Sequence, residues 1–346
     1  MSRLAVVLFN LGGPDSPDAI RPFLFNLFND PAIIGAPSPI RWALAQFISR
    51  RREATAREIY AQLGGRSPIL ELTRDQAEAL TVVLADRGHT AMVSIAMRYW
   101  HPMTAEAVAE VQAFEPDEVV LLPLYPQFST TTTGSSLEAW QREADRAGLK
   151  AREHAACCYP TEPGWIAAQA ELVSEGVQQA AAQASSPPRI LFSAHGLPKK
   201  IVASGDPYQW QVEQTAAAVV AALPGNVDHV VCYQSRVGPL EWIGPSTEAE
   251  LERAGRDGVP IVVVPIAFVS EHSETLVELD VEYREIASQL QIPAYVRVLA
   301  VGTNERFIRG LADVVEAVLR RSTAPAPPGN QRLCPMETGR CPCAAG

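Results

Sequence analysis

His195 is the residue whose position most strongly indicates chemistry. It follows the apolar run Arg189–Ser193 and precedes the turn Gly196–Pro198. A neutral imidazole near pH 7 can accept a proton or bind a metal ion. A histidine at the end of a strand can also be structural, with its ring bonded to a loop carbonyl. Because ligands of parallel α/β sheets bind at the carboxyl ends of the strands, the position favours a functional role.

A row of glutamates directly after the apolar run Ile261–Phe268 is the second candidate. Its members are Glu271, Glu274, Glu278 and Glu282. Their spacing of three, four and four residues places all of them on one face of a helix. Such a face is most often solvated, because like charges repel. The strand end and the apolar neighbours favour instead a face that lines a cleft, where it would attract divalent cations or carry protons away, with His272 as a second imidazole.

A cation beside aromatic rings forms the third group. Arg98 and Tyr99 end an apolar run, and Trp100 follows them. Arg98 could pair locally, but a guanidinium next to aromatic faces also suits a planar ligand that carries carboxylates. The hydroxyl-rich segment Ser129–Ser136 could cap a helix or bind an anion. Trp242 is a further aromatic residue, on a Gly/Pro-rich loop.

Three of the six cysteines fall within the last thirteen residues, as C-x6-C-x-C. They are Cys334, Cys341 and Cys343. The spacing lacks the two separated C-x2-C pairs of a zinc ribbon. Three thiolates leave a four-cysteine site one ligand short, and Cys158 or its neighbour Cys157 could supply the fourth. Four thiolates fit zinc or an iron–sulfur cluster, and the alternative is a redox-inert tail.

Strands and helices alternate along the chain and must position these residues. Nearly continuous apolar runs are typical of parallel strands covered on both faces. The predicted strands are Leu4–Asn10, Met92–Arg98, Glu118–Leu124, Arg189–Ser193, His229–Gln234 and Ile261–Phe268. Helical segments such as Thr104–Ala113, Trp165–Ala182 and Pro207–Ala222 lie between them. The alternation predicts an α/β fold of the doubly wound, Rossmann-like class with parallel sheets.

The chain also repeats itself weakly. Val6–Pro14 is similar to Ile190–Pro198, and Leu121–Ser129 is similar to Val263–Glu271. The repeat predicts two similar α/β domains, residues 1–162 and 163–321, of which the second carries His195 and the acidic helix. The Pro-rich stretch Ser322–Asn330 is typical of a linker. A linker and cysteine-bearing tail at 322–346 therefore follows the domains.

The spacing of the repeats predicts an insertion in the first domain, at about residues 23–63. Its apolar side chains include Ile40, Trp42, Leu44 and Phe47, and three arginines, Arg50–Arg52, follow. One interpretation is a core helix whose basic end suits the helix dipole. The other is an apolar lip with a basic edge, beside a ligand pocket or a bilayer surface.

Composition narrows the classes of function. The chain has 346 residues, 47% of them hydrophobic, and a formal net charge of −10, which argues against binding to nucleic acid phosphates. The first apolar run ends at Asn10, too soon for a signal peptide, and none reaches the roughly 18 residues of a membrane span. The sequence has neither a Walker A loop nor a G-x-G-x-x-G or G-x-S-x-G motif, so we expect no nucleotide cofactor.

The chain as a whole resembles the ferrochelatases, from about Ala5 to about Ala312. The motifs that carry the resemblance are LFNLGGP, GGRSPI, MRYWHP, YPQFS with TTGSS, FSAHGLP, GDPY, YQSRVGP with W-x-GP, and PIAFVSEHSETLVELDVEY. The resemblance implies two chelatase-type halves. It also implies a lyase that inserts Fe²⁺ into protoporphyrin IX, the last step of haem biosynthesis, without a nucleotide.

The resemblance assigns roles to individual residues. His195 and Glu274 match positions that flank the porphyrin face, where His195 would take pyrrole protons or hold iron. Glu274, with Glu278, would lie on an acidic path opposite His195. The matched pocket positions are Arg98, Tyr60, Ser67, Arg51 and Trp242, beside which Tyr99 is the further porphyrin-binding candidate. Phe23–Ile48 matches an apolar lip, which favours the second interpretation of the insertion.

The cysteine tail resembles the [2Fe–2S] site of some bacterial ferrochelatases. In animal members the first cysteine lies in the YPQ-x-S segment, where this chain has Thr130. The resemblance therefore implies a [2Fe–2S] cluster whose fourth ligand comes from elsewhere. The implied ligands are Cys158, Cys334, Cys341 and Cys343, with Cys157 as the alternative to Cys158.

Three other functions remain open at this point. They are a coproporphyrin III ferrochelatase, a cobalt chelatase of similar fold, and a haem or iron carrier without catalysis. We expect protoporphyrin IX and ferrous iron as binding partners, no nucleic acid, and a peripheral membrane contact through the apolar lip. We expect a monomer or homodimer in the cytoplasm, at most peripheral at the inner face of the cell membrane.

Overall fold

The computed structural model describes residues 2–236, 238–320, 325, 327–328 and 331–345. The chain divides into two compact units. The first comprises Met1–Cys158, Ala312–Arg332 and Ala345–Gly346, and the second comprises Tyr159–Leu311 and Leu333–Ala344. Most of the predicted linker Ser322–Asn330 lies outside the described residues, as does Arg321 at the predicted domain end.

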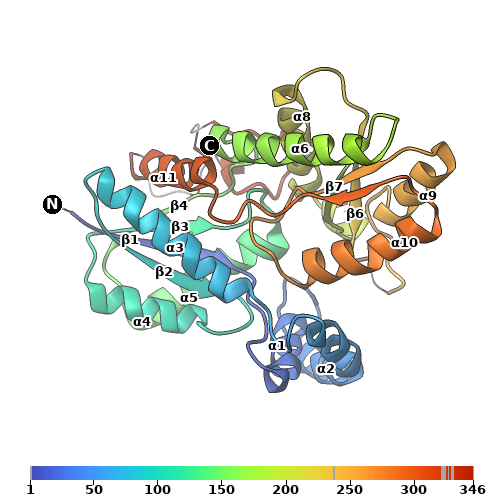
Figure 1. Ribbon diagram of the computed structural model, residues 1–346. Coiled ribbons are helices and arrows are strands. Elements are labelled where there is room, and N and C mark those ends of the chain that lie inside the picture. The colour runs from blue at the N-terminus through green and yellow to red at the C-terminus, as the bar shows by residue number, and fades with distance from the viewer. Residues whose placement is uncertain (1, 237, 321–324, 326, 329–330, 346) are drawn as a thin grey trace. The chain divides into compact units, whose positions relative to one another are not determined.

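The first unit is built on a four-stranded parallel sheet in the order β2-β1-β3-β4 (Figure 1). Its strands are β1 (Arg3–Asn10), β2 (Thr90–Met97), β3 (Glu118–Pro123) and β4 (Arg152–Ala155). Its helices are η1 (Pro17–Ala19), α1 (Ile20–Phe28), α2 (Ser38–Ala61), α3 (Ile69–Asp86), α4 (Thr104–Phe114), the π-helix η2 (Thr130–Gly134) and α5 (Ser135–Ala147).

The second unit repeats this topology with the strand order β6-β5-β7-β8. Its strands are β5 (Arg189–His195), β6 (His229–Gln234), β7 (Ile261–Pro265) and β8 (Tyr295–Arg297). Its helices are α6 (Pro163–Gln183), α7 (Lys199–Ala203), α8 (Tyr208–Ala222), α9 (Thr247–Asp257), the π-helix η3 (Glu274–Glu282) and α10 (Tyr283–Gln289). Helix α11 (Glu305–Leu319) begins in the second unit and continues into the first at Ala312, and η4 (Pro342–Ala345) ends at the first residue of another segment of the first unit. The predicted fold class, two similar α/β halves with parallel sheets, is confirmed.

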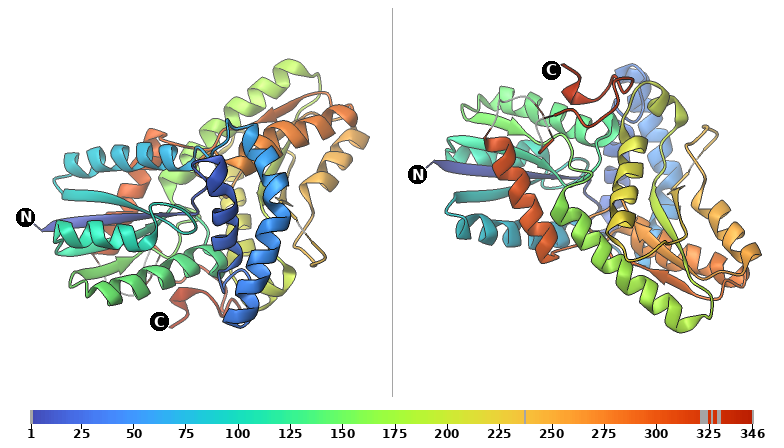
Figure 2. Two further views of the ribbon diagram at one scale, coloured as in Figure 1. Left: turned by 90° about the horizontal axis from the view of Figure 1, so that it is seen from below. Right: turned by 90° about the horizontal axis from the view of Figure 1, so that it is seen from above.

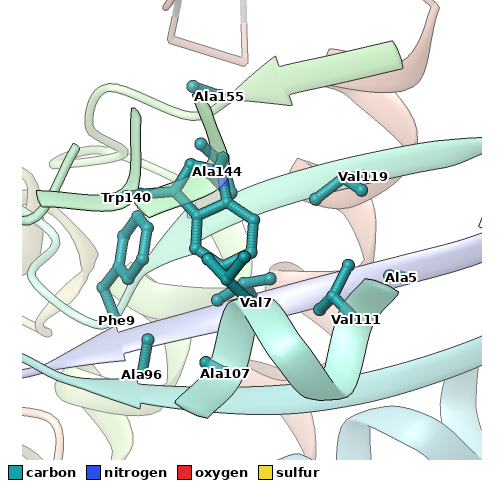
Figure 3. Packing of buried hydrophobic residues seen from close by; sticks show 12 residues of the cluster. Ala5, Val7, Phe9, Ala96, Ala107, Val111, Val119, Trp140, Ala144 and Ala155 are labelled. Carbon is teal, nitrogen blue, oxygen red and sulfur yellow. The ribbon is translucent and has the colours of Figure 1, made fainter. Parts of the chain in front are cut away.

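The core of the first unit explains why its apolar runs form buried strands. Ala5, Val7 and Phe9 alternate along β1 and face α4 and α5 (Figure 3). Trp140 of α5 is fully buried against them, with its ring centroid 6.1 Å from that of Phe9. Burying an aromatic side chain of this size contributes about 4–6 kcal/mol as an upper bound. The apolar runs that predicted the strands therefore supply the side chains of this core.

Helices α1 and α2 have no counterpart of similar length between β5 and β6, where the chain forms only α7 and α8. The two helices lie side by side (Figure 2). Ile40, Trp42 and Phe47 of α2 are 56%, 54% and 63% exposed, so the interpretation of α2 as a core helix is wrong for these side chains. Among the helices in the described part of the chain, none combines the length and apolar character needed to cross a bilayer.

Candidate functional site

The carboxyl ends of neighbouring strands bring the predicted catalytic residues of the second unit together. β5 ends at His195 and its neighbour β6 ends at Gln234. On the other side of β5, β7 leads through residues 266–273 into the π-helix η3, which begins at Glu274. Because the strands are parallel, these three ends lie at one edge of the sheet, which is the edge where ligands bind in such folds.

His195 and Glu274 form a direct pair at this edge, so the expectation that Glu274 lies opposite His195 is wrong. The Nδ1 atom of His195 lies 2.9 Å from Glu274 Oε2, and the two side chains are 40% and 25% exposed. Burial lowers the pKa of His195, but the charge and hydrogen bond of Glu274 outweigh it and raise that pKa above its ordinary value. Burial raises the pKa of Glu274, yet His195 and His272 together hold it well below the usual range. The pair therefore favours an imidazolium beside a carboxylate.

His272 approaches the same carboxylate from the loop before η3. Its Nε2 atom lies 3.9 Å from Glu274 Oε2, and its Nδ1 atom lies 3.1 Å from the carbonyl oxygen of Ser270. The side chain is buried, and its ring packs on Phe268 with centroids 4.8 Å apart. Two imidazoles thus flank one carboxylate, His195 in hydrogen-bond contact at 2.9 Å and His272 farther away at 3.9 Å.

Glu278 is held next to this group by the end of β6. Gln234 Nε2 donates both to the backbone oxygen of Glu274, at 3.1 Å, and to Glu278 Oε2, at 3.0 Å. The amide nitrogen and the hydroxyl of Ser235 donate to Glu278 at 2.8 and 2.5 Å, and the Tyr283 hydroxyl lies 3.1 Å from it. Burial and the charge of Glu274 raise the pKa of Glu278, so this carboxyl holds a proton more readily than an exposed one.

The sequence predicted that the four glutamates share one helical face, and this prediction is wrong. Glu271 precedes the helix and pairs with Arg297 at 2.6 Å, while Glu282 is exposed. Glu274 and Glu278 alone meet the network of His195 and Gln234. The physical reason is that the helix begins only at Glu274, so Glu271 lies in the preceding loop, while Glu282 is the last residue of η3 and lies at the surface.

Trp242 packs against the turn that follows His195. Its loop pairs with that turn through a bridge to Pro198 and a hydrogen bond from the Ile243 amide to the Leu197 carbonyl. A Cβ atom added to Gly196 would lie 2.9 Å from the Gln234 carbonyl oxygen and 3.3 Å from Trp242. Glycine is therefore required here because a side chain would overlap the backbone at the end of β6, and it also leaves room for the indole.

Arg98 and Tyr99, at the end of β2 in the first unit, share an acceptor that the sequence did not reveal. Asp30 is 3% exposed, and its Oδ2 atom accepts from Arg98 Nη2 at 2.7 Å, the Tyr99 hydroxyl at 2.8 Å and the Ser135 hydroxyl at 2.5 Å. Arg98 Nε donates to Ser135 Oγ at 2.6 Å. Tyr99 is 1% exposed, and burial together with Asp30 raises the pKa of its hydroxyl.

The other predicted pocket residues of the first unit differ in exposure. Tyr60, near the end of α2, is buried with Ile20, Phe23 and Leu24 of α1. Ser67 is buried, and its amide donates to the Pro14 carbonyl at 2.7 Å. Arg51 lies exposed on α2. The structure thus brings Arg98, Tyr99 and Asp30 into one network, and it leaves Arg51 at the surface of this unit.

The cysteines named as cluster ligands lie in two places, and Cys232 is buried in β6. Cys157 and Cys158, in the first unit, are buried with their sulfur atoms 3.1 Å apart. In the second unit Cys334 and Cys341 are buried, Gln211 Nε2 donates to Cys334 Sγ at 3.0 Å, and the Arg340 amide donates to the Gly205 carbonyl. Throughout the residues that the structure describes, no three His, Cys, Asp or Glu side chains are grouped as metal ligands.

Comparison with known proteins connects this architecture to one family. A ferrochelatase family model matches residues 3–319. The chain is 54% identical over 346 residues to a ferrochelatase of Caulobacter vibrioides, covering 99% of this chain and 98% of that protein. It is 53% identical to a ferrochelatase of Phenylobacterium zucineum, covering 99% of both chains.

Among solved structures, the chain resembles the sirohydrochlorin chelatase SirB of Bacillus subtilis subspecies spizizenii in complex with cobalt. The TM-score is 0.55 at 10% identity, and the match covers 92% of this chain and 96% of that one, which is a likeness of fold. The family of this chain follows from the family match and from the sequence identity, which extends over nearly the full length of both relatives. The chain belongs to the ferrochelatase family.

Proposed function

We propose that this protein is a ferrochelatase that inserts Fe²⁺ into protoporphyrin IX to form protohaem, the last step of haem biosynthesis. The observation that carries the proposal is the His195–Glu274 pair, held at 2.9 Å where two parallel strands end, in a chain of the ferrochelatase family. Metal insertion replaces two pyrrole N–H protons by one Fe²⁺ ion, so the site must hold a cation and accept protons. This pair can do both.

His195 is the residue to which we assign the first proton transfer. A neutral imidazole accepts a pyrrole proton, and the adjacent Glu274 carboxylate stabilises the imidazolium that results. Glu278, whose pKa burial and Glu274 raise, is a second proton acceptor next to it. Iron enters as substrate on the oxygen and nitrogen donors of Glu274 and neutral His195, with His272 beside them, and His195 releases iron before it accepts the pyrrole proton, because one ring nitrogen cannot hold both.

The ring has to be bent before a pyrrole nitrogen can offer its lone pair to iron. Rigid aromatic and apolar walls can hold that distortion with binding energy from the rest of the macrocycle. We assign ring and carboxylate binding to six residues. They are Arg98, Tyr60, Ser67, Arg51, Trp242 and Tyr99. Because the Tyr99 hydroxyl is bonded to Asp30, its part in binding is to support Arg98.

The exposed face of α2 supports a peripheral membrane contact. Ile40, Trp42 and Phe47 project from it, and Arg50–Arg52 follow on the same helix. An apolar face with a basic edge is the composition of helices that lie in the bilayer interface. We therefore propose that the protein works in the cytoplasm and contacts the inner face of the membrane through this helix, where a lipophilic porphyrin would be delivered.

We also propose a [2Fe–2S] cluster on Cys158, Cys334, Cys341 and Cys343. Thiolates are the ligands of such clusters, and hydrogen bonds to sulfur, such as that from Gln211 to Cys334, tune them. When bound, the cluster would supply one-electron redox chemistry, which the insertion of Fe²⁺ does not require. Protein purified without oxygen should contain iron and acid-labile sulfide and absorb visible light. Cys341→Ser should lose all three while the matched buried variant Cys232→Ser keeps them, and a colourless protein that contains zinc would refute the cluster.

The function itself is tested by anaerobic incubation of the protein with Fe²⁺ and protoporphyrin IX, followed by absorbance. We expect catalytic formation of protohaem, faster than with coproporphyrin III. Faster turnover of coproporphyrin III would change the assigned substrate. Bound porphyrin without any turnover would make the protein a carrier and contradict the proposal.

A further inference from the structure

Arg297 is a buried charge that the chemistry described above does not use. It lies on the edge strand β8 and is 4% exposed, although it is a guanidinium. Its Nη1 atom donates to Glu271 Oε1 at 2.6 Å, and its Nη2 atom donates to Asp280 Oδ2. Burial lowers the pKa of Arg297, but the two carboxylates more than compensate. The side chain is therefore a permanent cation that bridges two anions.

The two anions lie on either side of the residues that matter for catalysis. Glu271 is three residues before Glu274, and Asp280 is two residues after Glu278. Glu271 lies in the loop before η3, and Asp280 lies within η3. Arg297 therefore ties the loop that leads into the helix to the helix itself.

Other contacts from the same strand hold the same segment. The Tyr295 hydroxyl donates to the Leu279 carbonyl at 2.5 Å, and the amide of Ala300 donates to Glu271 Oε1 at 2.9 Å. A π-helix is rare because an α-helix is normally the more stable choice for the same residues, so a long π segment needs contacts from outside the helix. β8 and the residues after it supply these contacts, and Arg297 supplies the charged ones.

We propose that Arg297 is a positioning residue for metal insertion: by binding Glu271 and Asp280 together it fixes the π-helical register of η3, which places Glu274 on His195. Without this clamp, relaxation of η3 toward an α-helix would turn Glu274 away from the 2.9 Å contact with His195. The inference rests on the proposed function, because it assumes that Glu274 acts in metal insertion. Arg297 itself touches neither substrate.

The same unit offers a matched control for this clamp. Arg189, at the start of β5, is 10% exposed and also bridges two carboxylates, Asp228 at 2.7 Å and Asp257 at 2.8 Å. It lies at the opposite end of the strand that carries His195. Arg297→Gln and Arg189→Gln each leave two carboxylates without their cation, so both should lower the melting temperature. Only the first should disturb η3.

The experiment compares kcat and the KM for porphyrin in these variants and in Glu274→Gln. We expect Arg297→Gln to lower kcat about tenfold with KM within about twofold, because what is lost is one charge-assisted hydrogen bond at the reacting group. We expect kcat of Arg189→Gln to stay within about twofold of the wild type. Arg297→Gln combined with Glu274→Gln should lose little more than Glu274→Gln alone, since both act on the same contact.

Three results would overturn the proposal. The first is equal kcat in Arg297→Gln and Arg189→Gln, and the second is losses that multiply in the double variant. The third is full activity of Glu274→Gln, which would also remove Glu274 from the proposed function, whereas the first two leave that function intact. If Arg297→Gln does not fold, Asp280→Asn, which removes one arm of the clamp, must show the same fall in kcat and the same lack of additivity.

Discussion

Replacing Glu274 by glutamine tests the electrostatics of the site. The substitution keeps the shape of the side chain and removes the charge that faces His195 Nδ1 at 2.9 Å. A hydrogen bond to a charged group contributes about 1.5–3 kcal/mol. Because the two side chains are 40% and 25% exposed, water screens part of this, and the lower half of the range applies. We therefore expect kcat to fall about 10- to 45-fold.

The same substitution should change the pH profile in a defined direction. His195 accepts a proton only when neutral, so activity should fall as the pH drops through the pKa of His195, which Glu274 raises above 6.5. In Glu274→Gln the negative charge that raises the pKa of His195 is gone, whereas burial, which lowers that pKa, remains. The pKa of His195 should then be lower, and the acid limb of kcat/KM should move to lower pH even though the maximal rate is reduced.

The assay is initial-rate anaerobic metal insertion across the pH range, with binding of porphyrin measured separately by fluorescence. Glu282→Gln is the matched control, because it removes the same charge from an exposed position of the same helix. An acid limb of Glu274→Gln that coincides with the wild-type limb, or lies at higher pH, would refute the assignment of that limb to His195. An equal loss of kcat in Glu282→Gln would show that the effect comes from the net charge of the helix and not from the contact with His195.

Three further variants test other parts of the site. Gly196→Ala puts a Cβ atom 2.9 Å from a backbone carbonyl oxygen of β6. We expect kcat to fall at least tenfold and the melting temperature to fall by several degrees. Unchanged kinetics would contradict the close packing of this turn against β6. Tyr283→Phe removes the hydroxyl that lies 3.1 Å from Glu278 and 3.0 Å from Glu248. Turnover should fall a few-fold, and the free energy of unfolding should fall by about 1 kcal/mol. Turnover at the wild-type rate would exclude the hydroxyl from proton movement. Phe47→Glu should weaken co-sedimentation with anionic vesicles and leave turnover in detergent unchanged; equal vesicle binding would contradict the membrane contact of α2.

The sequence could predict much of the fold because its signals are local. Of the eight strands in the described residues, six were predicted from nearly continuous apolar runs, and the structure has them with ends shifted by a few residues. The two edge strands were missed. β4 and β8 have only four and three residues, and they include charged residues, Arg152 and Glu153 in β4 and Arg297 in β8. Edge strands need less apolar burial, so periodicity does not mark them.

The site was harder to predict where it depends on partners distant in sequence. Strand ends and family resemblance pointed to His195 and Glu274, whose contact spans 79 residues. The π-helix was not predictable, because spacing arguments assume the turn of an α-helix. Asp30 gave no signal either, since a single aspartate between two helices is usually solvated. Its burial depends on Arg98 and Tyr99, which come from a strand far along the chain.

The most direct test of the central claim is the single-turnover behaviour of His195→Ala. The variant should bind protoporphyrin IX with close to wild-type affinity, because the pocket residues remain. Anaerobic addition of Fe²⁺ should then leave the bound porphyrin without metal, whereas the wild type converts it to protohaem. Conversion by His195→Ala at the wild-type rate would contradict the claim that His195 is the reacting centre.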